Sequence, residues 1–288
     1  MAFPGHTMVW LARLLWPSRR IYFDSFLSRY DSNVNDRKAY TSHSLHGLVD
    51  WLLDWSSCLL SHRIFLDTQE HIDYFSRQFG ISREKMVRVP IGANTAIFYP
   101  RESPQNSKEF IVHFHGMFIP LQGVKYILEA AELLRDSPDI IFNIIGSGQE
   151  HDEISKLVQL KKMPNVQLLG RKGLNEVAQY IAKSDICLGI FGDTEKSERV
   201  VPNKVYEYIA MKKAVITADT PAIKEFFANE RHMILCERSS GRSIAEAILK
   251  LKSSPEQRIE LAENSYAYFI DHMSPRMIVY DLIKYLHI

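Results

Sequence analysis

The feature that most restricts the fold of this chain is a regular alternation of apolar and amphipathic segments between residues 110 and 269. The apolar segments predict strands at 110–114, 140–145, 166–169, 186–191, 214–217 and 233–236. The amphipathic segments predict helices at 124–134, 151–160, 175–182, from 204 onward, and at 222–227, 244–252 and 255–269. Nearly continuous apolar strands separated by helices are typical of a parallel sheet covered on both faces. We therefore predict a Rossmann-like α/β domain that binds its ligand at the carboxyl ends of the strands.

The first hundred residues carry a shorter version of the same pattern. Strands are predicted at 20–23, 63–67 and 86–90, and helices at 48–62 and 69–79. The second helix is expected to stop at Gly80, because glycine readily adopts the left-handed conformation that ends helices. The polar stretch 28–44 contains many turn-forming residues and is predicted to be a loop. The segment 91–100 is predicted to be an irregular connector.

The composition is that of an ordinary globular protein. The chain has 288 residues, of which 46% are hydrophobic, and a formal net charge of +1. This balance gives no reason to expect nucleic acid as a partner. The three cysteines, Cys58, Cys187 and Cys236, lie far apart, and two of them fall in apolar strand segments. Buried, reduced thiols and a cytoplasmic location are therefore expected.

The N-terminal segment mixes apolar and basic residues without reaching the length of a transmembrane helix. It contains Trp10, Leu11, Leu14, Leu15 and Trp16 beside Arg13, Arg19 and Arg20. Two interpretations remain open. The segment either packs as a helix into the first domain or lies on a membrane surface, which would place the protein at the inner face of the membrane.

The stretch Asp193–Ala218 carries the chemistry most suggestive of a ligand site. It predicts a loop, a short helix that begins after Pro202, and a strand. Helical spacing places Lys204, Glu207 and Tyr208 on one side. Lys204 and the helix N-terminus, with Asn203, suit a phosphate, and Glu207 suits ribose hydroxyls. The alternative is a solvated Lys–Glu pair on an exposed helix.

The segment P-N-K-V-Y-E-Y-I-A-M-K-K-A-V-I-T, residues 202–217, resembles a motif of the family 4 (group 1) glycosyltransferases of the GT-B fold. The variant it resembles, P-x-K-x-x-E-x-x-A-x-G-x-P-V-I, occurs in bacterial enzymes that build surface polysaccharides and glycolipids. The family's E-x7-E pattern has its second Glu at Glu207. Its first Glu would fall at Arg199, so that half of the pattern is lost.

A second segment, F-H-G-M-F-I-P-L-Q-G at 114–123, forms a strand that runs into Gly116 and a loop that leads to a helix. Such a turn offers backbone N–H groups to an anion, although it is also an ordinary connection in this kind of fold. It resembles the family's G-R-x-x-x-x-K-G, whose Arg and Lys hold the diphosphate. Met117 and Gln122 stand at those two positions, so two positive charges are missing, and Lys204 is expected to restore one.

Further resemblances extend the implied binding site. Gly146 and Gly148 match glycines that in the family allow a phosphate or sugar to come close. Arg171 follows a Leu-Gly pair that matches the loop beside the nucleotide base. His113 and His115 share one face of the first strand of this domain, either as core residues or, for His115, as a contact to phosphate or acceptor. No Asp-x-Asp pair is present, so we assign no metal ligand and no cofactor beyond the donor substrate.

The catalytic residues are the least constrained part of the interpretation. The resemblance places a catalytic group after a strand of the first domain, where this chain has Asp24. Asp193 and Glu198 precede the Lys204 helix and are the other carboxylates within reach of a bound sugar. We select Asp24 and Asp193 as catalytic candidates, and the alternative for each is a loop or capping role.

The resemblance implies a GT-B fold with two Rossmann-like domains, of which the N-terminal one is incomplete. The implied limits are 1–100, 101–272, and a helix within 273–288 that crosses back to the first domain. The implied activity is transfer of a hexose from a nucleotide-diphosphate sugar to a saccharide or lipid-linked acceptor, with retention and without metal. Two alternatives remain: a nucleotide-sugar-binding subunit completed by a partner chain or a second copy, and a sugar-nucleotide epimerase.

Overall fold

The computed structural model describes residues 5–102 and 108–286, and the chain divides into two α/β units. Unit 1 comprises Met1–Pro90 with Thr194–Val201 and Pro221–Glu225, and unit 2 comprises the remaining segments. The predicted boundary near residue 100 lies in the connector that begins unit 2 at Ile91. No helix in the described part of the chain is long and apolar enough to cross a membrane.

Unit 2 contains a six-stranded parallel sheet with the strand order β6-β5-β4-β7-β8-β9. Its strands are β4 (Phe110–Met117), β5 (Ile140–Ser147), β6 (Val166–Leu168), β7 (Ile186–Leu188), β8 (Ala214–Ala218) and β9 (Ile234–Cys236). The chain builds outward from β4 to β6 and then continues on the other side of β4 with β7. The direction of winding therefore changes between β4 and β7, which is where sheets of this kind bind ligands.

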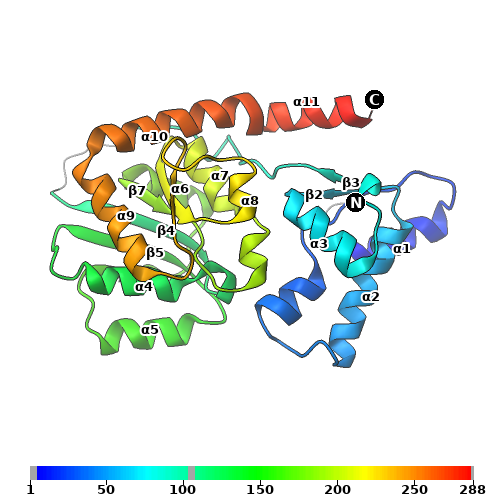
Figure 1. The fold of residues 1–288 in the computed structure, drawn as a ribbon, viewed down its shortest axis with the longest axis horizontal. Helices are drawn as coiled ribbons and strands as arrows, with labels where there is room; N and C mark the ends of the chain where they lie inside the picture. The colour runs from blue at the N-terminus through cyan, green and yellow to red at the C-terminus, as the bar shows by residue number, and fades with distance from the viewer. Residues whose placement is uncertain (1–4, 103–107, 287–288) are drawn as a thin grey trace. The chain divides into compact units, whose positions relative to one another are not determined.

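Helices cover this sheet, and Figure 1 shows α4 and α5 on the opposite side of the strands from α10. The helices of unit 2 are α4 (Val124–Leu133), α5 (His151–Leu160), α6 (Leu174–Lys183), α7 (Asn203–Ala210), α9 (Gly241–Ser253), α10 (Pro255–Tyr268) and α11 (Pro275–Leu286). Ile127, Ala131 and Leu134 are buried in the core, as their spacing predicted. Strands β7 and β8 are buried throughout, as expected for a sheet covered on both faces. The alternation of strands and helices predicted for this part of the chain is therefore confirmed.

Unit 1 contains a three-stranded parallel sheet in the order β1-β2-β3. Its strands are β1 (Tyr22–Asp24), β2 (Arg63–Leu66) and β3 (Met86–Arg88), and its helices are α1 (His6–Leu15), α2 (Leu45–Leu60), α3 (Gln69–Phe79) and α8 (Pro221–Lys224). Helix α3 has the predicted limits. The Thr68 hydroxyl accepts a hydrogen bond from His71 N at 3.0 Å and caps its start, and Gly80 ends it at φ +64°.

The polar stretch 28–44 is not the loop that was predicted, because it includes a π-helical turn, Asp31–Asp36. The buried carboxylate of Asp54, on α2, accepts hydrogen bonds from Ser28 Oγ at 2.6 Å and from the backbone N–H of Tyr30 at 2.9 Å. These contacts hold the chain at the start of the turn. Turn-forming residues predicted irregular structure, but a partner more than twenty positions away organises them.

Two segments from the second half of the sequence belong to unit 1. The backbone O of Arg199 accepts a hydrogen bond from Thr68 Oγ1 at 2.6 Å, and the Arg199 guanidinium lies 2.7 Å from the buried carboxylate of Asp31. The Glu225 carboxylate accepts from the backbone N–H groups of Gln69 and Glu70, the first residues of α3. Both segments lie within 101–272, the range that was expected to form one uninterrupted domain. Helix α11 belongs to unit 2, and its expected return to the first domain stays a prediction.

Candidate functional site

The carboxyl ends of β4 and β5 meet where the sheet of unit 2 changes its direction of winding. Gly116 and Gly146 are register partners on these strands. A Cβ at Gly146 would overlap the carbonyl oxygen of Gly116, and one at Gly116 would lie 2.6 Å from Lys204 Nζ. Both positions therefore require glycine, and the backbone of β4 passes directly beside the lysine ammonium.

Lys204, at the start of α7, is buried, with 4% of its surface exposed. Its Nζ donates to Gln122 Oε1 and lies 3.7 Å from the centre of the Phe114 ring. Burial lowers the pKa of Lys204 well below its ordinary value, and the carboxylate of Glu207 opposes that effect. The expected alternative of a solvated Lys–Glu pair is wrong, because this cation is enclosed with only a neutral amide as its hydrogen-bond acceptor among the described residues.

Glu207 is joined to the two histidines of β4. Its Oε2 lies 2.7 Å from His115 Nε2, and His115 Nδ1 lies 3.1 Å from His113 Nε2. The hydroxyl of Tyr208 accepts from the backbone N–H of His115 at 3.3 Å. With Glu207 ionised, the consistent arrangement has His113 Nε2–H donating to His115, and His115 Nε2–H donating to the carboxylate. Among the described residues, no hydrogen-bond partner of Glu207 Oε1 is found.

The protonation of this chain of residues is shifted by burial. Burial raises the pKa of Glu207 to about 7, against the opposing effect of Lys204. Burial also lowers the pKa of His115 well below its ordinary value, and the charge of Lys204 lowers it further. His115 is therefore a neutral ring at neutral pH that holds one oxygen of Glu207. This is a structural role, and a contact of His115 with phosphate or acceptor stays a prediction.

The raised pKa of Glu207 predicts that the stability of the folded protein falls as the pH rises from 4.5 to about 7. Between its unfolded value of 4.5 and about 7, the folded protein keeps a proton that the unfolded chain has lost. Stability from this group is therefore complete below pH 4.5 and is lost as the pH rises to about 7. We expect Glu207→Gln to stabilise the protein at pH 8 by roughly 3 kcal/mol relative to its effect at pH 4.5. Urea unfolding at both pH values measures this difference, and an equal effect at both would contradict the assignment.

The other expected binding residues lie around the same strand ends. Met117 ends β4 with half of its surface exposed, and Gly148 packs against the backbone of Phe118. Arg171 is exposed in the loop after β6, which reaches β5 through the hydrogen bond from Gly146 N to Gly170 O at 2.9 Å. Asn203 is the first, exposed residue of α7. The binding roles of these side chains stay predictions.

The two catalytic candidates belong to different units. Asp24 ends β1 in unit 1, and burial raises its pKa. Asp193 lies in unit 2, where its half-exposed carboxylate accepts hydrogen bonds from Lys125 Nζ at 2.9 Å and Tyr126 OH at 2.8 Å. The Lys125 ammonium lowers the pKa of Asp193. Both assignments stay predictions, and the partners of Asp193 already account for its position.

Residues 97–268, more than half of the chain, match the family model described as glycosyl transferases group 1. The chain belongs to this family. The matched range contains Gly116, Gln122, Lys204 and Glu207, so the site lies in the part of the sequence that carries the family signal. The family that the motifs resembled is thus confirmed, and the pairing of His115 with Glu207 is a feature that sequence reasoning missed.

Curated relatives of this chain include three glycosyltransferases that match parts of it. An uncharacterized glycosyltransferase of Methanocaldococcus jannaschii is 27% identical over 180 residues, 60% of this chain and 45% of the relative. The putative colanic acid biosynthesis glycosyl transferase WcaI of Escherichia coli is 29% identical over 117 residues, 40% and 28% of the two chains. The putative teichuronic acid biosynthesis glycosyltransferase TuaC of Bacillus subtilis is 24% identical over 151 residues, 52% and 35% of the two chains. The matched regions span less than half the length of each relative.

Solved structures resemble the fold over almost the whole chain. Anabaena HepE in complex with UDP and glucose superposes with a TM-score of 0.77 at 15% identity, covering 98% of this chain and 74% of HepE. Sucrose-phosphate synthase from Thermosynechococcus elongatus gives 0.78 at 16% identity, covering 98% and 71%. These likenesses confirm the predicted α/β fold of GT-B type.

Proposed function

We propose that this protein is a glycosyltransferase that moves a sugar from a nucleotide-diphosphate donor to a saccharide or lipid-linked acceptor. The observation that carries the proposal is the enclosed Lys204 ammonium at the change in winding direction of the sheet. A buried cation without an anionic hydrogen-bond partner is costly, and a bound diphosphate supplies the missing charge. Colanic and teichuronic acid synthesis in the relatives' names supports a role in surface polysaccharide or glycolipid synthesis.

The chemistry follows from where charge develops during transfer. As the sugar leaves, negative charge grows on the terminal phosphate of the nucleotide diphosphate. Lys204 and the backbone N–H groups at the start of α7 stabilise that charge from fixed positions. Glu207 Oε1 accepts a hydrogen bond from a ribose hydroxyl, while His115 holds Oε2. The proposal includes retention at the anomeric carbon and no metal requirement, which proton NMR of the fresh product and assays with chelator test.

Calorimetric titration with UDP, GDP and ADP, with and without Mg²⁺, tests the donor site. One nucleotide is expected to bind without metal. Lys204→Met keeps the apolar contact with Phe114 but removes the charge-assisted contact to phosphate. The loss should be about 1.5–3 kcal/mol, or roughly tenfold or more in affinity. Lys183→Ala, at an exposed lysine that ends α6, is the control and should bind like wild type. Equal affinity for Lys204→Met and wild type would reject the site.

A second candidate is a nucleotide-sugar-binding subunit without activity of its own. It is favoured by the neutral Met117 and Gln122 at the two diphosphate-binding positions and by Arg199, which is engaged by Asp31. Such a subunit would bind the nucleotide with the same dependence on Lys204. It would not release nucleotide from a sugar donor until a partner chain, or a second copy, was supplied. Nucleotide release in the presence of acceptor therefore separates the two candidates.

A further inference from the structure

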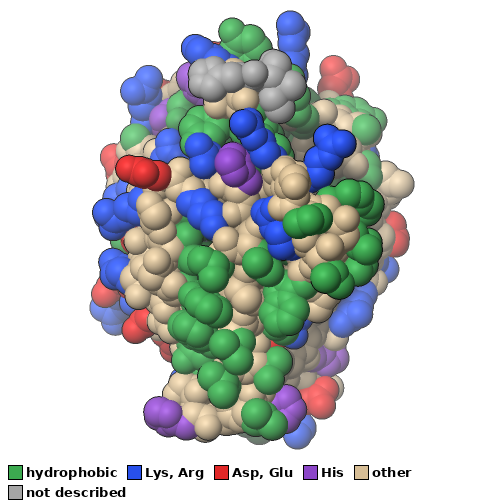
Figure 2. Space-filling model, turned by 90° about the vertical axis from the view of Figure 1, so that its right-hand side faces the viewer, with side chains coloured by type: hydrophobic (Ala, Val, Ile, Leu, Met, Phe, Trp, Pro, Cys, Tyr) green, Lys and Arg blue, Asp and Glu red, His purple; other side chains and the backbone are tan. Residues whose placement is uncertain are grey.

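Helices α1 and α2 expose a continuous series of large apolar side chains, which we call the α1–α2 face. Its members are Met8, Trp10, Leu11, Leu14, Leu15 and Trp16 from α1 and its end, and Leu45, Leu48, Val49, Leu52 and Leu59 from α2. Leu14 is 78% exposed and Leu45 is 74% exposed. Figure 2 looks at the side on which these helices are drawn in Figure 1 and shows hydrophobic side chains running down it, with Lys and Arg side chains above them. Clustered large apolar side chains on a protein surface mark an interaction site.

Packing within unit 1 does not bury the side chains of this face. His6, Val9 and Ala12 are the side chains that α1 buries, and Ser57 and Cys58 are among those that α2 buries. The exposed side chains of α2 recur at intervals of three, four and seven residues, so they form a stripe on the side of the helix away from the core. The sequence analysis left packing and membrane contact as alternatives. Helix α1 packs with one side and leaves the other exposed.

The four tryptophans of the chain all belong to this region. They are Trp10, Trp16, Trp51 and Trp55. Trp51 and Trp55 stack with ring centres 5.9 Å apart on α2, and Trp10 Nε1 donates to Ser56 Oγ at 3.1 Å, which ties α1 to α2 at the surface. Tryptophan is enriched where an apolar phase meets water, because its ring is apolar and its N–H is polar.

Cationic side chains border the α1–α2 face. They are Arg13, Arg19, Arg20, Arg63 and Lys85. Arg13 and Lys85 donate to backbone carbonyls, of Leu60 and Leu59 respectively, and in the part of the chain that is described none of the five pairs with a carboxylate. Burial lowers the pKa of His62, and the charges of Arg20, Arg63, Lys85 and Arg13 lower it further.

Acidic groups are absent from the exposed part of this region. Residues 5–23 contain three arginines and no Asp or Glu. The acidic residues of α2, Asp50 and Asp54, are buried and hydrogen-bonded inside unit 1, to Arg29 and Ser28 among others. The surface is therefore apolar with a basic border.

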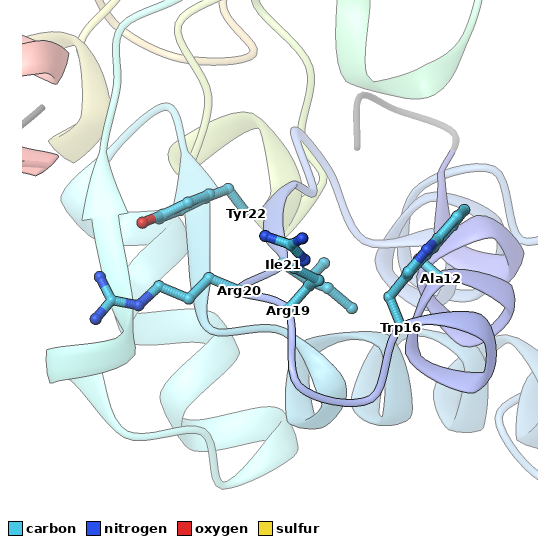
Figure 3. Close-up of a pocket in the computed structure, with 6 residues that line it drawn as sticks. All are labelled: Ala12, Trp16, Arg19, Arg20, Ile21 and Tyr22. Carbon is cyan, nitrogen blue, oxygen red and sulfur yellow. The ribbon is translucent and has the colours of Figure 1, made fainter.

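Two hollows at the end of α1 combine both kinds of side chain. One, of about 420 Å³, is lined by Ala12, Trp16, Arg19, Arg20, Ile21 and Tyr22. Figure 3 shows Trp16 and Ala12 on one side of it, with Arg20 and Tyr22 on the other. The second, of about 670 Å³, is lined by Trp10, Leu11, Arg13, Leu14, Pro17 and Leu60. Each places an arginine beside an apolar wall, which suits a phosphate attached to a hydrocarbon chain.

We propose that the α1–α2 face docks on a bilayer that contains anionic lipids. The leucines and tryptophans enter the boundary between headgroups and acyl chains, and the arginines contact lipid phosphates. A bilayer matches a surface that is apolar at its centre, cationic at its border and without exposed carboxylates in residues 5–23 and α2. The inference does not depend on nucleotide binding, and a membrane position suits a lipid-linked acceptor.

Co-sedimentation of the full chain with vesicles tests the proposal. Vesicles of phosphatidylglycerol and phosphatidylcholine in equal parts should bind the protein, and vesicles of phosphatidylcholine alone should bind it much more weakly. Binding should shift tryptophan emission to shorter wavelength, because Trp10 and Trp16 are exposed on this face. Arg19→Glu/Arg20→Glu should weaken binding to the anionic vesicles about tenfold or more, given about 1 kcal/mol for each basic residue at such a surface. Lys156→Glu/Lys183→Glu, at exposed lysines of unit 2, changes net charge equally and should have a much smaller effect.

A second pair of variants tests the apolar part of the face. Leu14→Ser/Leu48→Ser should weaken vesicle binding about tenfold or more. Leu160→Ser/Leu174→Ser, at exposed leucines of α5 and α6, should bind like wild type. Equal binding to both vesicle types, or no binding, would overturn the proposal. So would a wild-type oligomer, seen by light scattering, that becomes monomeric in Leu14→Ser/Leu48→Ser, because the face would then contact protein.

Discussion

Gly146→Ala is expected to destabilise unit 2 by at least about 3 kcal/mol. Gly146 has φ +149°, and a Cβ there would overlap the carbonyl oxygen of Gly116 and lie 2.9 Å from a ring carbon of Phe118. The overlapping atom is backbone at the end of β4, so a side-chain rotation cannot relieve it. The ends of β4 and β5 would have to separate beside Lys204, and nucleotide affinity is expected to fall together with stability.

Urea unfolding followed by far-ultraviolet circular dichroism measures the change. Tryptophan fluorescence is unsuitable here, because all four tryptophans are in unit 1. Gly170→Ala is the matched control, since Gly170 has φ +65° but nothing within 4 Å of the added Cβ. It should lose about 1 kcal/mol, the cost of the left-handed conformation alone. Similar losses in the two variants would show that the strand ends can move apart freely.

Arg199→Met is expected to cost unit 1 about 3–5 kcal/mol. The Arg199 guanidinium is 7% exposed, lies 2.7 Å from the fully buried Asp31 carboxylate, and stacks 4.4 Å from the centre of the Tyr74 ring. Removing it leaves a buried charge without its closest cationic partner. Arg199 stands where the family pattern would place its first Glu. We therefore expect the arginine at this position to have a structural role.

Tryptophan fluorescence during urea unfolding reports on this change, because unit 1 contains every tryptophan. Glu195→Ala is the control, since Glu195 is mostly exposed and lies 3.5 Å from the same guanidinium. Exposed pairs contribute little, so a loss under about 1 kcal/mol is expected. The double variant Asp31→Asn/Arg199→Met should recover part of the stability by removing the unpaired charge. A loss for Arg199→Met no larger than that for Glu195→Ala would contradict the buried-pair argument.

Local patterns determined the fold and the centre of the site. The alternation over 110–269 predicted the six-stranded sheet, and α3 was predicted with its observed ends because its amphipathic spacing and the stop at Gly80 are local signals. The spacing of Lys204, Glu207 and Tyr208 placed them on one side of α7, and the turn at Gly116 placed a strand end beside them. Such features depend on residues a few positions apart, whose geometry the helix or strand period sets.

Tertiary structure alone decided which groups those residues touch. Lys204 meets Gln122 across 82 positions, Glu207 meets His115 across 92, and Arg199 meets Asp31 across 168. No periodicity in the sequence encodes these distances, because they depend on how separate elements pack. Burial then changed the chemistry of the same side chains. Lys204 and Glu207, for which a solvated pair was one alternative, are an enclosed cation and a carboxylate with a raised pKa. The stretch 28–44, which was predicted to be a loop, contains a turn held by Asp54.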